Sequence, residues 1–103
     1  MGAAHQMMLV GYVDHIEEAA IERDRRRPDV YAEFVRLALG LQASGIVEGA
    51  KAIAERIRWG RRVERGDRDF VVNNDDPACW ARWATRDHAE LRGYFSFRVR
   101  TAR

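Results

Sequence analysis

Residues 25–41 read RRRPDVYAEFVRLALGL and contain both a helix break and a helix start. Pro28 biases Arg27 away from helical geometry, so one helix ends there, and proline suits the first turn of the next helix. Ser44 and Gly45 supply turn chemistry after it. The apolar residues between recur at spacings of three and four, on one side of a helix: Val30, Phe34, Leu37 and Leu41. The stretch therefore predicts a helix that packs one face into a core.

An amphipathic helix is predicted before this break, from about His5 to Arg25. Its apolar stripe consists of Leu9, Val13, Ile16 and Ala20. Its other face carries four carboxylates: Asp14, Glu17, Glu18 and Glu22.

Two more helices are predicted after Gly45. The third runs from Glu48 or Gly49 to Arg62 and has its own apolar stripe. The fourth covers Pro77 to Leu91, because 73–77 reads NNDDP, a capping Asx followed by proline at the first helical position.

Two short segments predict strands. Residues 70–72 are aromatic and β-branched, and residues 94–100 alternate, with Phe95, Phe97 and Val99 on one face. Pairing the segments gives each strand a partner. We therefore expect an α+β fold, mainly α, in which about four helices carry a two-stranded hairpin-like pair and resemble a winged helix. Residues 1–26 form the N-terminal helix, residues 27–103 the winged-helix-like domain, and both belong to one compact unit.

The 103-residue chain has the size of one domain. Cys79 is the single cysteine, so no intrachain disulfide is available and a reducing cytoplasm is expected. No apolar run approaches the ~20 residues that cross a bilayer, and Met1 to Val10 lacks the features of a secretory signal.

No set of residues adds up to an active site. Cys79 and His88 lie nine residues apart on one predicted helix, about 13 Å along its axis, too far to act as a nucleophile and base. The acidic pairs Asp67/Asp69 and Asp75/Asp76 are typical of turns and caps. The glycines of the second half are isolated, so there is no phosphate loop. We therefore expect a protein that is not an enzyme and uses no metal or cofactor.

Basic residues concentrate in the second half of the chain. Residues 51–103 hold thirteen bases against eight acids, whereas residues 1–50 hold five against eight. The predicted nucleic-acid contacts are Arg58, Arg61, Arg62, Arg65, Arg82 and Arg86. Two other interpretations stay open. Seventeen of the eighteen bases are Arg, as the codon usage of a GC-rich genome would produce, and several have carboxylates within helical reach, such as Arg58 with Glu55.

A sequence pattern links the chain to a known family. The pattern comprises 28–31 with Phe34, the run Gly49 to Trp59 (GAKAIAERIRW), 69–74 (DFVVNN), Ala81-Arg82, Gly93 to Phe95 and Arg98. In these residues the chain, from Arg27 to Arg100, resembles a family of small, largely uncharacterised phage and prophage proteins. It departs from that family at 75–80, where the family is richer in aromatic residues, and at Val71, where a basic residue is common. Residues 1–26 lie outside the resemblance.

The resemblance implies a phage setting in a bacterial host cell and no particular activity. Our leading hypothesis is a phage-type DNA-binding or regulatory protein whose helix from Pro77 to Leu91 enters the duplex groove, with the strand pair as wing. The alternative is a protein-binding inhibitor of a bacterial defence complex, similar to an anti-CRISPR. It would act through Asp14, Glu17, Glu18 and Glu22. A further role open to the N-terminal helix is homodimer formation.

Overall fold

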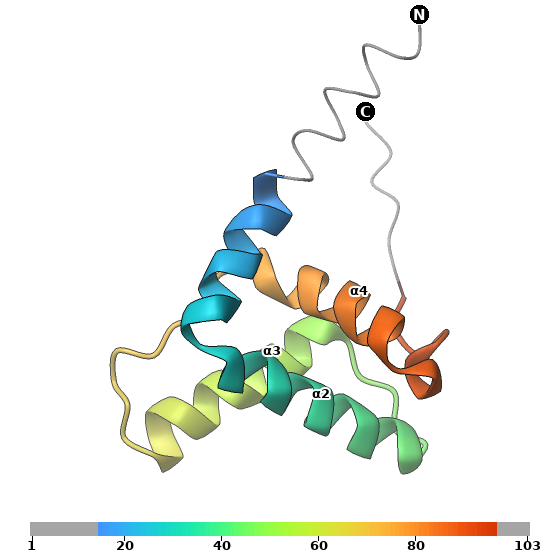
Figure 1. The fold of residues 1–103 in the computed structure, drawn as a ribbon. Helices are drawn as coiled ribbons and strands as arrows, with labels where there is room; N and C mark the ends of the chain where they lie inside the picture. Colours follow the sequence, from blue (N-terminus) through green and yellow to red (C-terminus); the bar gives the residue numbers. More distant parts are fainter. Residues whose placement is uncertain (1–14, 97–103) are drawn as a thin grey trace, which may run out of the picture.

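The computed structural model describes residues 15–96 of the chain. In order, these residues form the N-terminal helix (described over 15–26), α2 (Pro28–Ala43), α3 (Ala50–Trp59), a π-helical turn (Gly60–Glu64), α4 (Asp76–Asp87) and a 3-10 turn (Ala89–Leu91). In Figure 1 α2 and α3 cross in the lower half, α4 lies above them, and the N-terminal helix rises from the start of α2.

The predicted break before Pro28 is confirmed. Arg27 leaves helical geometry, with φ −138° and ψ 69°, and α2 starts at once with proline in its first turn. Val30, Phe34 and Ala38 are buried, so the inward stripe runs slightly differently from the predicted one. The helix ends at Ala43, where Gly45 takes a positive φ of 71° that suits glycine.

The third helix has an unexpected end. α3 stops at Trp59 and the chain continues as one π-helical turn, closed by the Arg65 amide donating to the Gly60 carbonyl at 3.0 Å. The inward side of α3 is Ile53, Ala54 and Ile57, and Arg61 follows on the same side.

The fourth predicted helix is shorter than expected. α4 ends at Asp87, because His88 adopts an extended conformation before the 3-10 turn. At its start Asn73 acts as an Asx residue, with Oδ1 accepting from the Asp75 amide at 2.9 Å. Leu91 closes the 3-10 turn and is fully buried.

The predicted α+β fold with a hairpin is wrong: residues 15–96 contain helices and turns but no strand. Residues 70–72 alternate in burial as a strand would, with Val72 partly packed against the core, but they are irregular and pair with no other described segment. Phe70 is buried, whereas Val71 is 78% exposed. The buried Phe70 ring holds the loop between α3 and α4 against the core. This packing places the three-residue segment without pairing in a sheet.

The second predicted strand fails for a similar reason. Tyr94 and Phe95 both turn toward the protein instead of pointing to opposite faces. The Tyr94 hydroxyl donates to the Ile46 carbonyl at 2.6 Å, and the Phe95 ring stacks on Phe34 at 5.8 Å. Gly93, with φ 76°, reverses the chain just before them. The remainder of this prediction, from Phe97 to Arg100, lies outside the described residues.

Without a strand pair in the described part of the chain, the winged-helix-like prediction is also wrong. In addition, α4, the element expected to enter a DNA groove, has seven of its twelve residues buried. A recognition helix needs a broad free face. Trp80, Trp83 and Ala84 instead make α4 a central part of the core.

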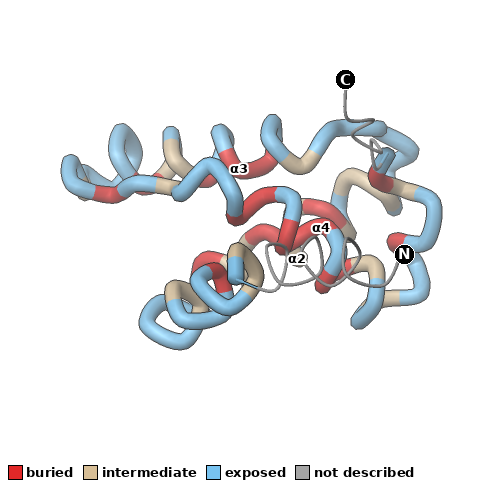
Figure 2. Tube along the Cα trace, turned by 90° about the horizontal axis from the view of Figure 1, so that it is seen from above, coloured by how far each residue is buried: buried red, intermediate tan, exposed pale blue. Residues whose placement is uncertain are grey.

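The core lies where α2, α3 and α4 face one another, as the buried segments in Figure 2 show. Phe34 is fully buried at its centre, 5.4 Å from the Trp80 ring and 5.8 Å from the Phe95 ring. Tyr31 meets Trp83 edge to face at 5.5 Å. Aromatic pairs from three separate parts of the chain therefore join one core.

The N-terminal helix packs on this core through three contacts. Ala20 is buried, the Trp83 indole N–H donates to the Glu17 carboxylate at 2.8 Å, and Arg23 forms a bidentate ion pair with Asp76, its shortest distance 2.6 Å. Among the described residues, no helix is both long and apolar enough to span a membrane.

Candidate nucleic-acid interface

Arg61, one of the predicted phosphate contacts, lies inside the protein. Its side chain is 7% exposed and donates to Asp29 at 2.8 Å and to Glu33 at 2.9 Å, both on α2. The guanidinium also lies over the Phe70 ring, 5.4 Å from its centroid. The hydrogen bond from Arg61 lowers the pKa of Asp29. Arg61 thus joins α2 to the end of α3 and offers no free charge to a phosphate.

The other predicted contacts near the end of α3 differ from one another. Arg58 donates to Glu55 at 2.8 Å on the surface of α3, where both side chains remain about half exposed. Arg65 lies 3.9 Å from Glu33 and is largely exposed. Arg62 is exposed and has no carboxylate partner within residues 15–96.

The two predicted contacts on α4 also differ. Arg86 donates to the neighbouring Asp87 at 2.8 Å, which lowers the pKa of that carboxyl. Arg82 makes no ion pair with the described carboxylates, and its Nη2 lies 3.3 Å from the Cys79 sulfur.

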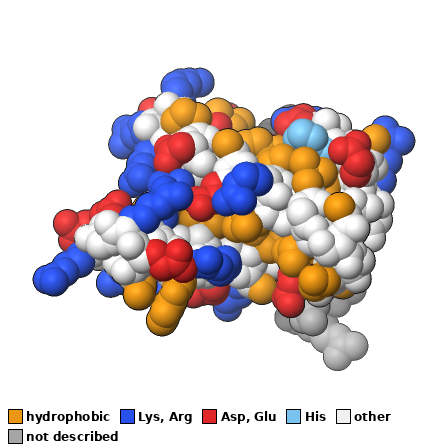
Figure 3. Space-filling view, turned by 90° about the horizontal axis from the view of Figure 1, so that it is seen from below, with side chains coloured by type: hydrophobic (Ala, Val, Ile, Leu, Met, Phe, Trp, Pro, Cys, Tyr) orange, Lys and Arg blue, Asp and Glu red, His pale blue; other side chains and the backbone are white. Residues whose placement is uncertain are grey.

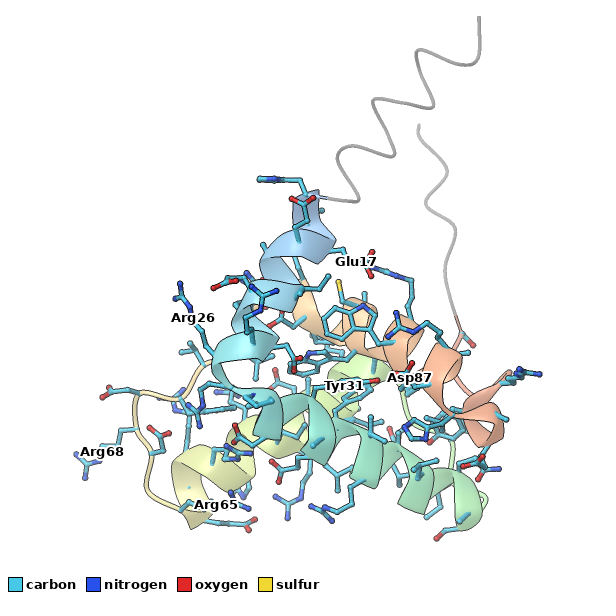
Figure 4. All side chains as sticks on the ribbon, viewed as in Figure 1. Glu17, Arg26, Tyr31, Arg65, Arg68 and Asp87 are labelled. Carbon is cyan, nitrogen blue, oxygen red and sulfur yellow. The ribbon has the colours of Figure 1, made fainter. Side chains whose placement is uncertain are left out.

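The predicted arginines do not share one surface. In Figure 4 Arg65 and Arg68 lie at the lower left, beyond the end of α3, whereas Asp87, the partner of Arg86, lies to the right of the centre, next to Tyr31. Figure 3 shows that, on the face seen from below, Lys and Arg side chains gather toward the left and are interspersed with Asp and Glu. The single basic face expected from the sequence is therefore divided.

Most cations in the described chain are neutralised by carboxylates. Ten of the fifteen Lys and Arg residues between 15 and 96 form an ion pair within 4.0 Å. The five that do not are Lys51, Arg62, Arg68, Arg82 and Arg92. These five decide where an anionic partner finds uncompensated charge.

Three of the five line the same groove. It is an open depression of about 1440 Å³ between the start of α3, the outer side of α4 and the segments 72–74 and 92–96. Lys51, Arg82 and Arg92 line it together with Arg86, and the carboxylates in its wall are Glu48 and Glu55. Since Glu55 is paired with Arg58 outside the lining, the groove carries an excess of positive charge.

Small residues make this groove possible. Ala54 of α3 and Ala81 of α4 are buried where the two helices meet, so the floor is low and apolar. Asn73, Asn74 and Thr85 add neutral hydrogen-bonding groups to the wall.

Tyr94 holds one rim of the groove in place. Its hydroxyl donates to the Ile46 carbonyl and accepts from the Glu48 amide at 3.0 Å. The loop before α3 is thereby fixed, and Gly49, the N-cap of α3, provides no side-chain cap and lines this end of the groove.

The acidic side chains proposed for protein binding are partly engaged in the fold. Glu17, which lies above α4 in Figure 4, accepts a hydrogen bond from the Trp83 indole N–H. Glu22 forms ion pairs with Arg25 at 3.2 Å and with Arg26 at 3.5 Å. Glu18 is exposed, and Asp14 lies outside the described residues.

No metal or nucleophile site stands out in the described part of the chain. Residues 15–96 contain no group of three His, Cys, Asp or Glu side chains placed to hold an ion. Cys79 is buried on α4, and burial raises the pKa of its thiol, which disfavours the reactive thiolate.

Sequence reasoning identified Arg82 and Arg86 but missed Lys51 and Arg92. Lys51 lies at the start of α3 and Arg92 after the 3-10 turn, forty-one positions apart. No local signal identified these two residues: Lys51 has Glu55 four positions further along α3, and no spacing in the sequence shows that two distant cations share a groove.

No family model, curated protein or solved structure matches the chain. The resemblance to small phage proteins therefore stays a prediction.

Proposed function

We propose that the protein binds nucleic acid, without catalysis, through the groove between α3 and α4. The observation that carries this proposal is that Lys51, Arg82 and Arg92, three of the five unpaired cations in residues 15–96, line one depression. Unpaired cations attract a phosphate backbone, because binding releases its condensed counterions.

The arrangement favours backbone contacts over base reading. Arg82 and Arg92 approach the groove from different segments, and α4, which carries Arg82, has seven of its twelve residues buried. Such contacts supply affinity and position but little sequence information. We therefore expect weak sequence preference.

The first test is a titration by fluorescence anisotropy with labelled single-stranded and duplex 20-mers at two salt concentrations. We expect micromolar affinity at about 50 mM salt. With about three phosphates neutralised, the logarithm of the affinity should fall with the logarithm of salt concentration with a slope of about −2 to −3. Absence of binding to both forms at low salt would contradict the proposal.

A matched pair of charge reversals locates the contact. Arg82→Glu and Arg68→Glu change the same side chain by the same charge, and both arginines are exposed and unpaired among residues 15–96. Only Arg82 lines the groove. Arg68 lies outside the lining, at the left edge of the molecule in Figure 4. We expect Arg82→Glu to weaken binding about tenfold and to reduce the salt slope by about one. Equal effects of the two reversals would place the contact elsewhere.

The protein-binding hypothesis gives the opposite pattern. If acidic residues of the N-terminal helix form the working surface, reversal of the exposed Glu18 to Lys abolishes partner binding and nucleic acid does not bind at low salt. We rank this second because Glu17 and Glu22 are already engaged by Trp83, Arg25 and Arg26.

A further inference from the structure

Trp59 is the feature that the fold leaves unexplained. It is 58% exposed at the end of α3, whereas the two other tryptophans, Trp80 and Trp83, are 4% and 6% exposed in the core. Val63, one turn further on, is 57% exposed. A large apolar ring left in water beside a second apolar side chain indicates a surface that contacts something.

The position of Trp59 connects it with the groove. Arg58, its neighbour in sequence, holds Glu55 at 2.8 Å, and Glu55 lines the groove wall. Lys51, Glu55 and Arg58 follow one another at spacings of four and three, so they form one row along α3, and Arg62 follows four residues later in the π turn. Trp59 stands beside this row, about 12 Å along the helix axis from Lys51.

Trp59 has arginines close to it in the chain, and one of them is uncompensated within residues 15–96. Arg62 is unpaired among the described residues, and Arg56 is held by Glu64 at 2.8 Å on the neighbouring side of the helix. Cations that track a phosphate backbone, next to an exposed ring on which a base can stack, are the two parts of a single-strand binding surface.

A duplex would not use this ring. Its bases are stacked on one another and present only their edges, whereas an unpaired base offers a π face. α4, the helix expected to read a duplex groove, has seven of its twelve residues buried.

We infer that the nucleic acid taken by this groove is single-stranded, with one base stacked on Trp59. The inference rests on the proposed function and adds the form of the ligand. The bound single strand of nucleic acid runs from Lys51 in the groove along the row on α3 to the indole of Trp59, a span of a few nucleotides.

The experiment uses the fluorescence of the protein itself, titrated with oligothymidylate of twenty residues at low salt. Because Trp59 is the exposed tryptophan, stacking should quench its emission and protect it from acrylamide. In Trp59→Phe the quenching should disappear while most of the affinity, measured by anisotropy, is retained.

Trp59→Ala should weaken oligothymidylate binding about tenfold and leave the salt slope unchanged, because a stacking contact and no phosphate contact is lost. Duplex affinity should not change. Val71→Ala is the control: it removes an exposed apolar side chain that lies neither on α3 nor in the groove lining, and affinity should stay within about twofold.

The outcomes are separable. If neither nucleic acid binds, the proposed function fails and this inference with it. If both forms bind but Trp59→Ala binds oligothymidylate as well as the unchanged protein does, the inference alone is overturned. It is likewise overturned if Trp59→Ala leaves binding intact and abolishes self-association in sedimentation, because the ring then covers a protein surface.

Discussion

Arg61 shows how burial changes the role of a charged side chain. It was expected at a phosphate, yet it donates to Asp29 and Glu33 of α2 and lies over Phe70. Arg27 approaches the same ring from the bend before α2, at 5.3 Å from the centroid. One guanidinium therefore connects α2, the end of α3 and the loop that follows.

Loss of Arg61 should reduce stability. Arg61→Ala removes the cation closest to both Asp29 and Glu33 and opens a gap beside Phe70, so we expect the free energy of unfolding to fall by about 2 kcal/mol. Urea denaturation measures this loss. The control is Arg62→Ala, the exposed neighbour, which should change the value by less than about 0.5 kcal/mol. A loss of nucleic-acid affinity at unchanged stability in Arg61→Ala would contradict the structural role.

Among the helices, the junction of α3 with its π turn falls at Gly60. Its backbone is helical, with φ −59° and ψ −43°, so glycine is not needed for conformation. A Cβ placed there would meet Nη1 of Arg56 at 3.3 Å, because Arg56 crosses Gly60 to reach Glu64 at 2.8 Å. The obstacle is the end of a flexible, exposed side chain.

Gly60→Ala should therefore be mildly stabilising. Arg56 can shift and lose a surface ion pair worth little, while alanine gains helix propensity, for a net gain of about 0.5 kcal/mol. Gly66→Ala is the matched comparison, because Gly66 has a φ of 76° and alanine there is strained. We expect it to lose about 1 kcal/mol. Thermal unfolding followed by circular dichroism compares the two, and a destabilised Gly60→Ala would show that Arg56 cannot move.

Across the protein as a whole, ion pairs couple stability to pH. Hydrogen bonds from Arg61 and Arg86 lower the pKa of Asp29 and Asp87. A carboxylate whose pKa is lowered in the folded protein stabilises the fold at pH values above its ordinary pKa. This contribution is lost as the pH falls through the lowered pKa. Asp24 has the opposite effect on the pH dependence of stability, because its pKa is raised. The larger cause is burial, and the second is the negative charge of Asp76. Its Oδ1 is buried without a hydrogen-bond partner in the described chain.

The free energy of unfolding should therefore fall as pH decreases from about 5 to 2.5. In Asp29→Asn the fall should be smaller, because one carboxylate with a lowered pKa is gone. In Asp24→Asn the free energy of unfolding at neutral pH should rise. Its decrease toward acid pH should become steeper, because the opposing contribution of Asp24 is removed. Urea titrations at a series of pH values test both slopes. Parallel curves for the unchanged protein and Asp29→Asn would contradict this assignment.

Local patterns in the chain determined the helices. The proline at Pro28 and the spacing of apolar residues located the break and α2, and NNDDP located the start of α4 to within one residue. These features depend on backbone restrictions and on which side of a helix is apolar, and both are local properties of the sequence.

Only the tertiary structure decided the rest. The aromatic segments at Phe70 and Phe95 became anchors of a helical core instead of strands, because Phe34 lies within reach of Phe95 and Arg61 lies over Phe70. Which arginines are free depends on carboxylates from distant helices, such as Asp29 and Glu33 for Arg61. Packing of α3 on α4 likewise brought Lys51, Arg82 and Arg92 to one groove, which no periodicity in the chain encodes.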